Sequence, residues 1–391
     1  MNNRFANIQN TKENLDAIGP LWTERDFSHP ERTIRLGTSF SGIGAIEHAM
    51  KRLGLNTEIM FAGDIDADCK ISYQANYGVG DEKWHTDIHD FDAKPFFGNI
   101  DLFVGGAPCQ AFSMRGKRGG FEDTRGTLFR EFARIVMECR PKVFIFENVR
   151  GLLNHDGGRT WSVIRQTFER DCDYQVYFQE LNGKDYGIPQ SRDRVFCIGF
   201  REPREFKYPA PIGLQGRSVY DFLDKQFSDK YLLKQKGVTF VSRKLNYEKS
   251  YTQINGEVML CQKRNQQFNW HGDFIFHPLT VEQASSQVGQ NTVFDTSLLE
   301  TTYYLNSTLS NYTIEEAEPH IFKMMKMEGE LSRYGCFRKL TPRECLRLMG
   351  FDDSFAIRVS DTAIYKQAGN SIIVDILMAL LREMDITQYG V

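Results

Sequence analysis

The sequence predicts an α/β fold: a mostly parallel β-sheet flanked by helices, with a smaller, mainly β or irregular domain inserted before the last helices. Two observations carry this prediction. Short apolar runs typical of buried strands alternate with amphipathic helical stretches over 33–200. Near residue 201 three prolines mark a boundary, the alternation stops, and a pattern of the first kind returns after 338. We therefore expect an N-terminal extension at 1–32, a first domain built from 33–200 and 338–391, and a second domain at 201–337.

Composition is that of an ordinary soluble protein of two or more domains. The chain has 391 residues, of which 41% are hydrophobic and 25% charged. It contains no apolar run near the roughly 18 residues of a membrane span, and its first residues lack the apolar core of a signal peptide. We therefore expect a cytoplasmic protein without a membrane partner.

The cysteine spacing argues against a metal site, and the net charge leaves nucleic-acid binding open. The eight cysteines are scattered, without a Cys-x-x-Cys pair or a Cys/His cluster at metal spacing, so we expect reduced thiols and no metal. A net charge of −3 does not by itself indicate a nucleic-acid binder. Basic residues nevertheless cluster at 115–134 and at 234–264, where each cluster fits either a solvated surface or a phosphate contact.

The first strand, 33–40, leads into a glycine turn and a helix. The turn is SGIGA at 41–45, and strand, glycine turn and helix together are typical of a nucleotide cradle, although Gly-x-Gly alone also fits a simple tight turn. The next strand, 57–63, brings Asp64 to the same sheet edge. An acidic residue about 20 positions after the glycine turn binds a ribose hydroxyl in dinucleotide folds. Asp87 follows on a loop after another helix.

A reactive cysteine is predicted in the run GGAPCQAFS at 105–113. The run follows an apolar strand at 101–104, so Cys109 lies just past the carboxyl end of a strand, where open α/β sheets place their chemistry. Pro108 fixes the backbone immediately before the thiol. Buried cysteines usually behave as small apolar groups, but this setting favours a functional thiol. The glycine-rich, basic stretch that follows, 114–126, is typical of a loop that closes on an anion.

Polar residues at two further strand ends complete the candidate site. The apolar strand 142–149 carries Glu147, and a carboxylate there is costly unless it binds something, so we expect a site role. The turn QSRDR at 190–194 precedes a strand and places Arg192 and Arg194 on one side of an extended segment. Such a pair suits an anionic or carbonyl-rich ligand, the alternative being a surface ion pair.

The remaining elements follow from capping and periodicity. We expect helices at 127–139 and 159–171 and strands at 174–181 and 193–200. A Thr cap with Pro in the first turn begins a helix within 339–351. A last glycine turn at 368–371 opens the helix 372–383.

In order and spacing, these motifs resemble those of the C5-cytosine DNA methyltransferase family of bacterial restriction-modification type. The resemblance covers about 34–200 and 338–383. It is carried by FSGIG at 40–44, GAPCQAFS at 106–113, FEDTRGTLF at 121–129, ENV at 147–149, QSRDR at 190–194, RKLTPREC at 338–345 and GNS at 369–371.

The resemblance implies a fold and a reaction. The first domain would be a Rossmann-like S-adenosylmethionine-dependent methyltransferase domain, and 201–337 would be the target-recognition domain. Cytosine C5 is a poor nucleophile, so the enzyme adds a thiolate at C6 first, and C5 of the resulting enamine attacks the methyl group. A carboxyl group at N3 supports the charge that develops on the ring. The product would be 5-methylcytosine in a specific DNA sequence, made on a flipped-out base.

The family's functional residues carry over onto matching positions of this chain. Cys109 would be the nucleophile, Glu147 the acid at N3, and Arg192 with Arg194 the pair that orients the base. The residues implied for the S-adenosyl-L-methionine pocket are Phe40, Ser41, Gly42, Gly44, Asp64, Ile65, Asp87, Ile88, Gly106, Pro108, Leu128, Asn370 and Ser371. Those implied for DNA contact in the closing loop and its neighbourhood are Gln110, Ser113, Arg115, Lys117 and Arg118. Two departures bear on cofactor affinity and not on chemistry: Ile65 replaces a common aromatic residue, and Ala45 replaces a common glycine.

The implied partner is double-stranded DNA, bound by a monomeric cytoplasmic enzyme associated with the nucleoid through its substrate. Enzymes of this type often have a cognate restriction endonuclease acting on the same site. Neither the target sequence nor the base-reading residues within 201–337 follow from the sequence, because Arg, Lys, Gln and Asn are too plentiful there.

Three other functions fit the sequence less well than a DNA methyltransferase does. A tRNA cytosine-5 methyltransferase of the same family typically has a Cys-Phe-Thr element in its recognition region, and the chain has only Cys336-Phe337-Arg338, next to another motif. A catalytically silent DNA-binding relative is expected to have lost Cys109 or Glu147, and both are present. A nicotinamide oxidoreductase is expected to have a complete Gly-x-Gly-x-x-Gly in the first turn, which is missing.

Overall fold

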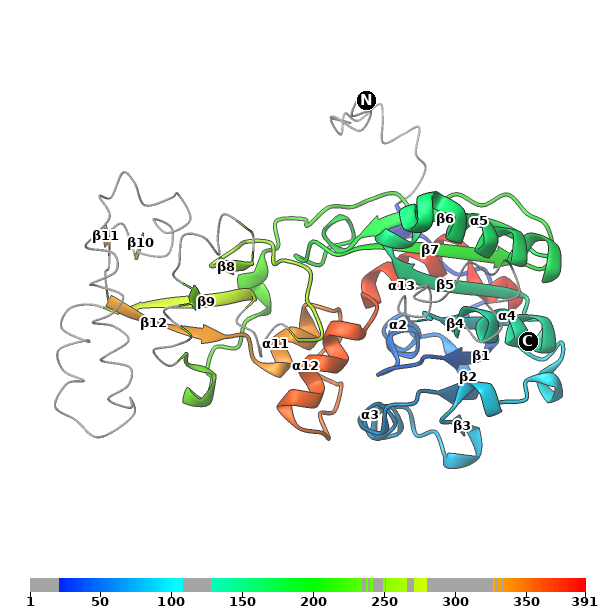
Figure 1. Ribbon diagram of the computed structural model, residues 1–391, viewed down its shortest axis with the longest axis horizontal. Helices are drawn as coiled ribbons and strands as arrows, with labels where there is room; N and C mark the ends of the chain where they lie inside the picture. The colour runs from blue at the N-terminus through cyan, green and yellow to red at the C-terminus, as the bar shows by residue number, and fades with distance from the viewer. Residues whose placement is uncertain are drawn as a thin grey trace, which may run out of the picture.

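The computed structural model describes residues 21–107, 128–233 and 334–391 and, between the last two ranges, chiefly 251–265 and 271–279. These residues form a larger lobe around a seven-stranded sheet and a smaller lobe around a three-stranded sheet (Figure 1).

The seven-stranded sheet is mostly parallel. Its strands lie in the order β3-β2-β1-β4-β5-β7-β6, with β7 antiparallel to both of its neighbours. The order reverses between β1 and β4, and such a switch point opens a ligand crevice at the carboxyl ends of the strands. The strands are β1 (Thr33–Ser39), β2 (Asn56–Gly63), β3 (Trp84–His85), β4 (Leu102–Gly105), β5 (Val143–Val149), β6 (Gln175–Asn182) and β7 (Asp193–Phe200).

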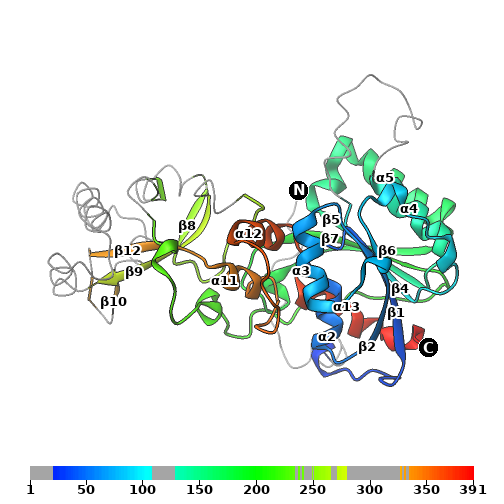
Figure 2. The same cartoon turned by 90° about the horizontal axis from the view of Figure 1, so that it is seen from below.

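Helices cover both faces of this sheet. One apolar cluster joins the sheet to α2 and α13, which also pack against each other, and a second joins it to α4 and α5. Figure 2 shows these pairs on opposite sides of the strands. The helices are α2 (Ala45–Arg52), α3 (Ala67–Tyr77), α4 (Leu128–Cys139), α5 (Arg159–Gln166), α11 (Pro342–Arg347), α12 (Asp361–Asn370) and α13 (Val374–Glu383). A π-helical turn, Thr167–Asp171, continues α5.

The smaller lobe contains short strands. β9 (Gly272–Leu279) pairs antiparallel with β12 (Tyr334–Lys339) and parallel with β8 (Thr252–Ile254). β10 (Lys326–Met327) and β11 (Glu330–Leu331) form a separate pair. Helices α11 and α12 lie between the two lobes (Figures 1 and 2).

The predicted strands and helices of the first domain are confirmed to within a few residues. The Thr341 side chain and Glu344 form a complete capping box at the start of α11, with Pro342 in the first turn. The structure differs at two places. Residues 84–85, expected as part of a loop, form the edge strand β3. Gly369 and Asn370, expected to open a helix, instead end α12. This helix was not predicted from the sequence. The domain boundaries at 32, 200 and 337 stay predictions.

Among the described residues, the helical stretch Asp361–Glu383 alone is long and apolar enough by composition to cross a membrane; it includes α12 and α13 and has a mean hydropathy of 1.2 over its best window. That window is 78% buried inside the protein, which is typical of core helices in a folded domain.

Candidate active site

The turn after β1 is strained in the way expected of a ligand cradle. Phe40 adopts a left-handed backbone with φ of 55°, which is rare for a bulky residue, and Gly42 and Gly44 have φ of 55° and 79°. A Cβ on Gly42 would project into open space among the described residues, whereas one on Gly44 would collide with the Tyr77 ring at 2.2 Å. The turn therefore leaves room on the side of Gly42 and packs closely behind Gly44.

Asp64 ties this turn to the end of β2. Its Oδ2 accepts a hydrogen bond of 3.0 Å from the backbone N–H of Gly42, and its Oδ1 accepts one of 2.9 Å from Asp66 N–H. Burial raises the pKa of Asp64, although these N–H groups oppose the shift. The next side chain, Ile65, is 76% exposed, an unusual environment for a large apolar group.

Two more predicted cofactor residues lie after β3. Asp87 caps a short 3-10 helix, and the backbone N–H and ring of His89 lower its pKa. Ile88 is buried in the apolar cluster beneath. Because the five strands from β3 to β5 are parallel, their carboxyl ends meet at one edge, and this edge carries the Gly42 turn, Asp64 and Asp87.

These groups fit S-adenosylmethionine. The glycine turn is open on the side of Gly42 among the described residues, and Asp64 carries carboxylate oxygens of the kind that bind ribose hydroxyls. The exposed face of Ile65 offers an apolar contact for the adenine ring. The fit rests on the turn and on these side chains.

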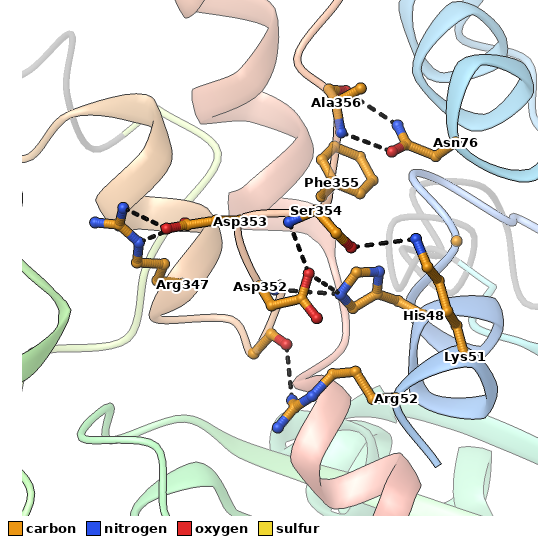
Figure 3. Close-up of polar contacts among 12 residues, drawn as sticks. His48, Lys51, Arg52, Asn76, Arg347, Asp352, Asp353, Ser354, Phe355 and Ala356 are labelled. Atoms are coloured by element: carbon orange, nitrogen blue, oxygen red, sulfur yellow. Dashed lines mark hydrogen bonds and ion pairs between the residues drawn. The ribbon is translucent and has the colours of Figure 1, made fainter. Parts of the chain in front are cut away.

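Helix α2, which starts at the glycine turn, is held from outside by the loop that follows α11 (Figure 3). The N–H of Asp352 donates to His48 Nε2 at 3.1 Å, and Lys51 Nζ donates to Ser354 Oγ at 3.1 Å. Asn76 of α3 exchanges two hydrogen bonds with the backbone of Ala356, at 2.7 and 3.0 Å. Burial lowers the pKa of His48 to about 4, so its ring is neutral and accepts the Asp352 N–H.

A buried carboxyl lies directly beneath the same turn. Glu47 Oε1 accepts from Tyr73 Oη at 2.5 Å and from Thr38 Oγ1 at 3.1 Å, and Thr38 also contacts Ser41 Oγ at 2.8 Å. Ser41 Oγ in turn accepts from Gly63 N–H at 2.9 Å. Burial raises the pKa of Glu47 to about 7. The predicted cofactor residue Ser41 thus joins β1 to β2 and connects to this carboxyl.

The path to the predicted nucleophile begins at β4. Gly105 ends the strand, and the amide of Asn148 donates a hydrogen bond of 2.8 Å to the carbonyl of Ala107. Asn148 is 4% exposed. The last strand of the parallel set thereby holds the backbone two residues before Cys109. Several predicted residues lie outside the described residues, namely Pro108, Cys109, Gln110, Ser113, Arg115, Lys117 and Arg118, with the loop 114–126.

Glu147 and Arg194 meet at this edge. Because β7 runs antiparallel to β5, its first residues lie beside the last residues of β5, and Arg194 pairs with Val149. Arg194 Nε lies 3.1 Å from Glu147 Oε1, and the two side chains are 15% and 13% exposed. Burial raises the pKa of Glu147, and the charges of Arg194 and Arg192 oppose the shift. A Cβ on Gly106 would approach Glu147 Oε2 to 2.9 Å, so the glycine makes room for the acid.

Arg192 has different surroundings. Its residue is 2% exposed, and its Nη1 donates to the carbonyl of Gln262 at 2.8 Å and to Cys261 Sγ at 3.6 Å. Its Nη2 donates to the carbonyls of Gly369 and Ser371 at 3.0 and 2.7 Å. The remaining donor, Nε, has no partner among the described residues. Burial lowers the pKa of Arg192 to about 10, which leaves it charged at neutral pH.

The other predicted cofactor residues lie on two helix ends. Asn370 is the exposed last residue of α12, and Ser371 follows it with 9% exposure. Gln367 of α12 accepts from Ser72 Oγ of α3 at 3.1 Å, which places this segment beside the helix that follows Ile65. Leu128, half-buried, begins α4 directly after residues 108–127, which lie outside the described residues.

Sequence reasoning missed several residues of this region. Asn148 lies inside the ENV motif at 147–149, and a polar amide near the end of an apolar strand could have indicated its role. Gln190 was quoted without a role, and it receives Gln262 N–H at 3.0 Å and donates to Leu348 O at 2.8 Å. Cys261 and Gln262 carried no signal, because their approach across about 70 residues of chain depends on tertiary structure.

Comparison with known proteins places the chain in a family. The family model described as "C-5 cytosine-specific DNA methylase" matches residues 35–385. The type II methyltransferase M.HpaII of Haemophilus parainfluenzae is 34% identical over 87% of this chain and 86% of its own length. The type II methyltransferase M.HhaI of Haemophilus parahaemolyticus is 33% identical over 86% of this chain and 90% of its own length. The chain therefore belongs to the C-5 cytosine-specific DNA methylase family.

It is accordingly an enzyme, a DNA (cytosine-5-)-methyltransferase. Solved structures agree on the fold. The DNMT2 of Spodoptera frugiperda superposes with a TM-score of 0.64 over 90% of this chain and 99% of its own, at 20% identity. The Dnmt2 methyltransferase of S. pombe gives a TM-score of 0.60 over 90% and 98%, at 18% identity. These likenesses show the Rossmann-like fold.

Proposed function

We propose that this enzyme is a sequence-specific DNA methyltransferase of the type II restriction-modification kind, which methylates C5 of a flipped-out cytosine through a covalent bond between Cys109 and C6. The observation that carries the proposal is the pairing of Glu147 with Arg194 beside Gly106, at the strand edge from which the chain runs to Cys109. The similarity to M.HpaII and M.HhaI over most of both chains supports the type II assignment.

Glu147 is suited to the cytosine N3. Its carboxyl lies in a poorly solvated position where burial raises its pKa, so it takes up a proton more readily than an exposed glutamate. Oε1 is engaged by Arg194, which leaves Oε2, the oxygen next to Gly106, to face the base. Arg194 holds the acid and orients the base with it. Arg192 contributes Nε, the donor that its contacts with the described residues leave unpaired.

The proposed methyl transfer begins with two linked bond changes on the cytosine ring. The Cys109 thiolate forms a bond to C6 while Glu147 gives a proton to N3, which makes C5 an enamine carbon. S-adenosylmethionine, when bound, would supply the electrophilic methyl group that C5 takes up, and its sulfur would keep the electron pair of the broken S–CH3 bond. N3 returns its proton to Glu147. A base removes the C5 proton, the C–H electron pair restores the C5=C6 bond, and the C6–S pair returns to Cys109.

The chain's own residues would hold the cofactor at the carboxyl edge of the sheet. The backbone of 40–44, with Ser41, Gly42 and Gly44, would line the methionine end. Asp64 would bind the ribose, and Ile65, Asp87 and Ile88 would surround the adenine. Gly106, Pro108, Leu128, Asn370 and Ser371 complete the proposed pocket. Ile65 supplies apolar contact without aromatic stacking, so we expect weaker adenine binding than in relatives with an aromatic residue.

The proposed substrate is double-stranded DNA, read by the region 201–337 and enclosed by the loop 114–126. The proposed DNA contacts of the cysteine loop are Gln110, Ser113, Arg115, Lys117 and Arg118. Lysine and arginine contacts to phosphate make binding fall with salt. We further propose that the enzyme acts as a monomer in the bacterial cytoplasm, with an endonuclease of the same specificity.

The test is transfer of labelled methyl groups from S-adenosylmethionine to unmethylated duplex DNA, with tRNA as a second substrate. Methylome sequencing of a methylation-deficient host that expresses the chain identifies the target. Cys109→Ser should abolish transfer, whereas Cys139→Ala, in the core helix α4, should preserve it. Full transfer by Cys109→Ser overturns the role of the thiol, and transfer to tRNA alone overturns the substrate.

A second experiment traps the intermediate. A target duplex containing 5-fluorocytosine lacks the proton that elimination must remove, so it should leave a covalent complex that survives denaturation. Absence of that complex, with binding of the duplex demonstrated by gel shift, would count against the covalent route.

A further inference from the structure

Arg192 stands where three parts of the chain meet. The QSRDR turn, 190–194, receives the segment Met259–Gln262 of the smaller lobe on one side and the segment 369–371 on the other. The turn, with the preceding Pro189, and the first segment share three further hydrogen bonds. Ser191 N–H donates to Met259 O, Met259 N–H donates to Pro189 O, and Gln262 N–H donates to Gln190 Oε1, while Gln190 Nε2 donates onward to Leu348 O.

The guanidinium of Arg192 is the group that touches both segments. Nη1 donates to Gln262 O, and Nη2 donates to Gly369 O and Ser371 O, all within 3.0 Å. Three carbonyls from chain segments more than 100 residues apart are thus gathered on one planar cation. A lysine ammonium is a compact point charge on a flexible stem and cannot reproduce this fork.

The two segments also touch each other directly at this place. A Cβ on Gly369 would lie 2.5 Å from the backbone nitrogen of Arg264 and 2.6 Å from the carbonyl carbon of Lys263. These are backbone atoms, which cannot turn aside as a flexible side chain does. The approach of 263–264 to the end of α12 therefore depends on glycine at position 369.

We propose that Arg192 is a positioning residue that joins the DNA-recognition segment 259–264 to the cofactor segment 369–371, so that the two ligands are bound cooperatively through it. The proposal rests on the proposed function, which assigns these segments to DNA and to S-adenosylmethionine. Arg194 differs, because its Nε engages the acid Glu147 and no contact links it to 369–371 among the described residues.

The first test needs no catalysis. Hydrogen exchange of the full chain, measured by mass spectrometry, should show faster exchange in 259–264 and in 369–373 together for Arg192→Lys. Arg194→Lys should leave 369–373 at the wild-type rate. Arg165→Lys, which changes an exposed pair with Glu169 on α5, is the matched control and should change neither segment. Faster exchange in only one of the two segments for Arg192→Lys overturns the proposal that Arg192 joins them.

The second test measures the coupling. S-adenosylhomocysteine affinity is determined by calorimetry with and without the target duplex, and the ratio of the two dissociation constants is the coupling factor. Arg192→Lys should weaken S-adenosylhomocysteine binding about tenfold or more and bring the factor close to one. An unchanged factor overturns the proposal. Where Arg192→Lys fails to fold, Gly369→Ala decides, because its Cβ forces the same two segments apart while the arginine side chain is kept, and an unchanged factor there has the same meaning.

Failure of the proposed function gives a different pattern. In that case the wild-type protein transfers no methyl group to any duplex, while the paired change in hydrogen exchange between Arg192→Lys and wild type remains measurable.

Discussion

The side-chain amide of Asn148 donates a 2.8 Å hydrogen bond to the carbonyl of Ala107 and so joins the end of β5 to the backbone that leads to Cys109. Asn148→Asp replaces this donor with an acceptor that faces a carbonyl oxygen. We expect kcat to fall about 100-fold, since a displacement of about 1 Å at a reacting group has effects of this size. The KM for S-adenosylmethionine should change much less. Asn99→Asp, at the opposite strand edge beside Arg35, is the control, and wild-type kcat in Asn148→Asp would contradict the role.

Gly106→Ala tests the space around Glu147, the proposed catalytic acid. The new Cβ would come within 2.9 Å of Glu147 Oε2 and 3.2 Å of its backbone oxygen, so the acid has to move. We expect a loss of about 1–3 kcal/mol in the free energy of unfolding, as for overpacking, and at least a tenfold loss of turnover. Gly151→Ala projects into open space and should leave both unchanged. Turnover equal to wild type in Gly106→Ala would show that the position of Oε2 does not matter.

Glu47 predicts a pH dependence of stability. Its pKa is about 7 in the folded protein and near 4.5 when unfolded, so the folded state binds the proton more tightly. The stabilisation is therefore complete below pH 4.5 and is lost as pH rises through 7, a change of roughly 3 kcal/mol. Glu47→Gln should flatten the free energy of unfolding between pH 5 and 8, measured by urea titration. Parallel curves for the two proteins would contradict the prediction.

His48 predicts the opposite slope. Its pKa is about 4 when folded and about 6.5 when unfolded, so its contribution is present above pH 6.5 and is lost as pH falls through 4. Protonation also destroys the acceptor for Asp352 N–H (Figure 3). The protection factors of the 352–356 amides, which are the exchange rates corrected for the intrinsic rate at each pH, should fall below pH 5 in the wild type. They should fall less in His48→Gln, whose amide oxygen stays an acceptor. An equal loss of protection in both proteins would exclude His48 as the cause.

Arg338 and Glu344 form a two-bond ion pair with no exposed surface on either side chain, at the junction of β12 and α11. Glu344→Gln leaves the arginine charge buried without its counter-ion, which costs about 3–5 kcal/mol. Adding Arg338→Met removes that charge and should recover part of the loss in thermal or urea unfolding. Equal destabilisation in the single and double variants would show that the capping of Thr341 matters more than the charge.

The first domain was predictable because its strands are short apolar runs, whose carboxyl ends must meet at one edge of a parallel sheet. Glu147 and Asp64 could be placed at strand ends on that edge from the sequence alone, whereas Asp87 was expected only on a loop. β3 was missed because two residues, 84–85, are too few to show a strand pattern. α12 was missed because glycine at 369 is typical of a turn, while here it permits a close approach of the backbone at 263–264.

The separate surroundings of Arg192 and Arg194 could not be predicted. Both stand on one side of the same short segment in the sequence. They differ because β7 leads one to Glu147 across a neighbouring strand, while segments from 261–262 and 369–371 surround the other. Such neighbours are set by tertiary structure. The role of Cys109 was inferred from local sequence and family resemblance and stays a prediction.

The joint at Arg192 and Gly369 is made largely of main-chain atoms: the carbonyls of Gln262, Gly369 and Ser371, and the backbone of Lys263 and Arg264. Every residue type has the same main-chain N–H and C=O groups, apart from the missing N–H of proline. We therefore expect this joint to tolerate a different sequence in the smaller lobe, provided that its backbone follows the same path past position 369. If the smaller lobe reads the DNA, as proposed, its specificity should then be exchangeable without redesign of the proposed cofactor pocket.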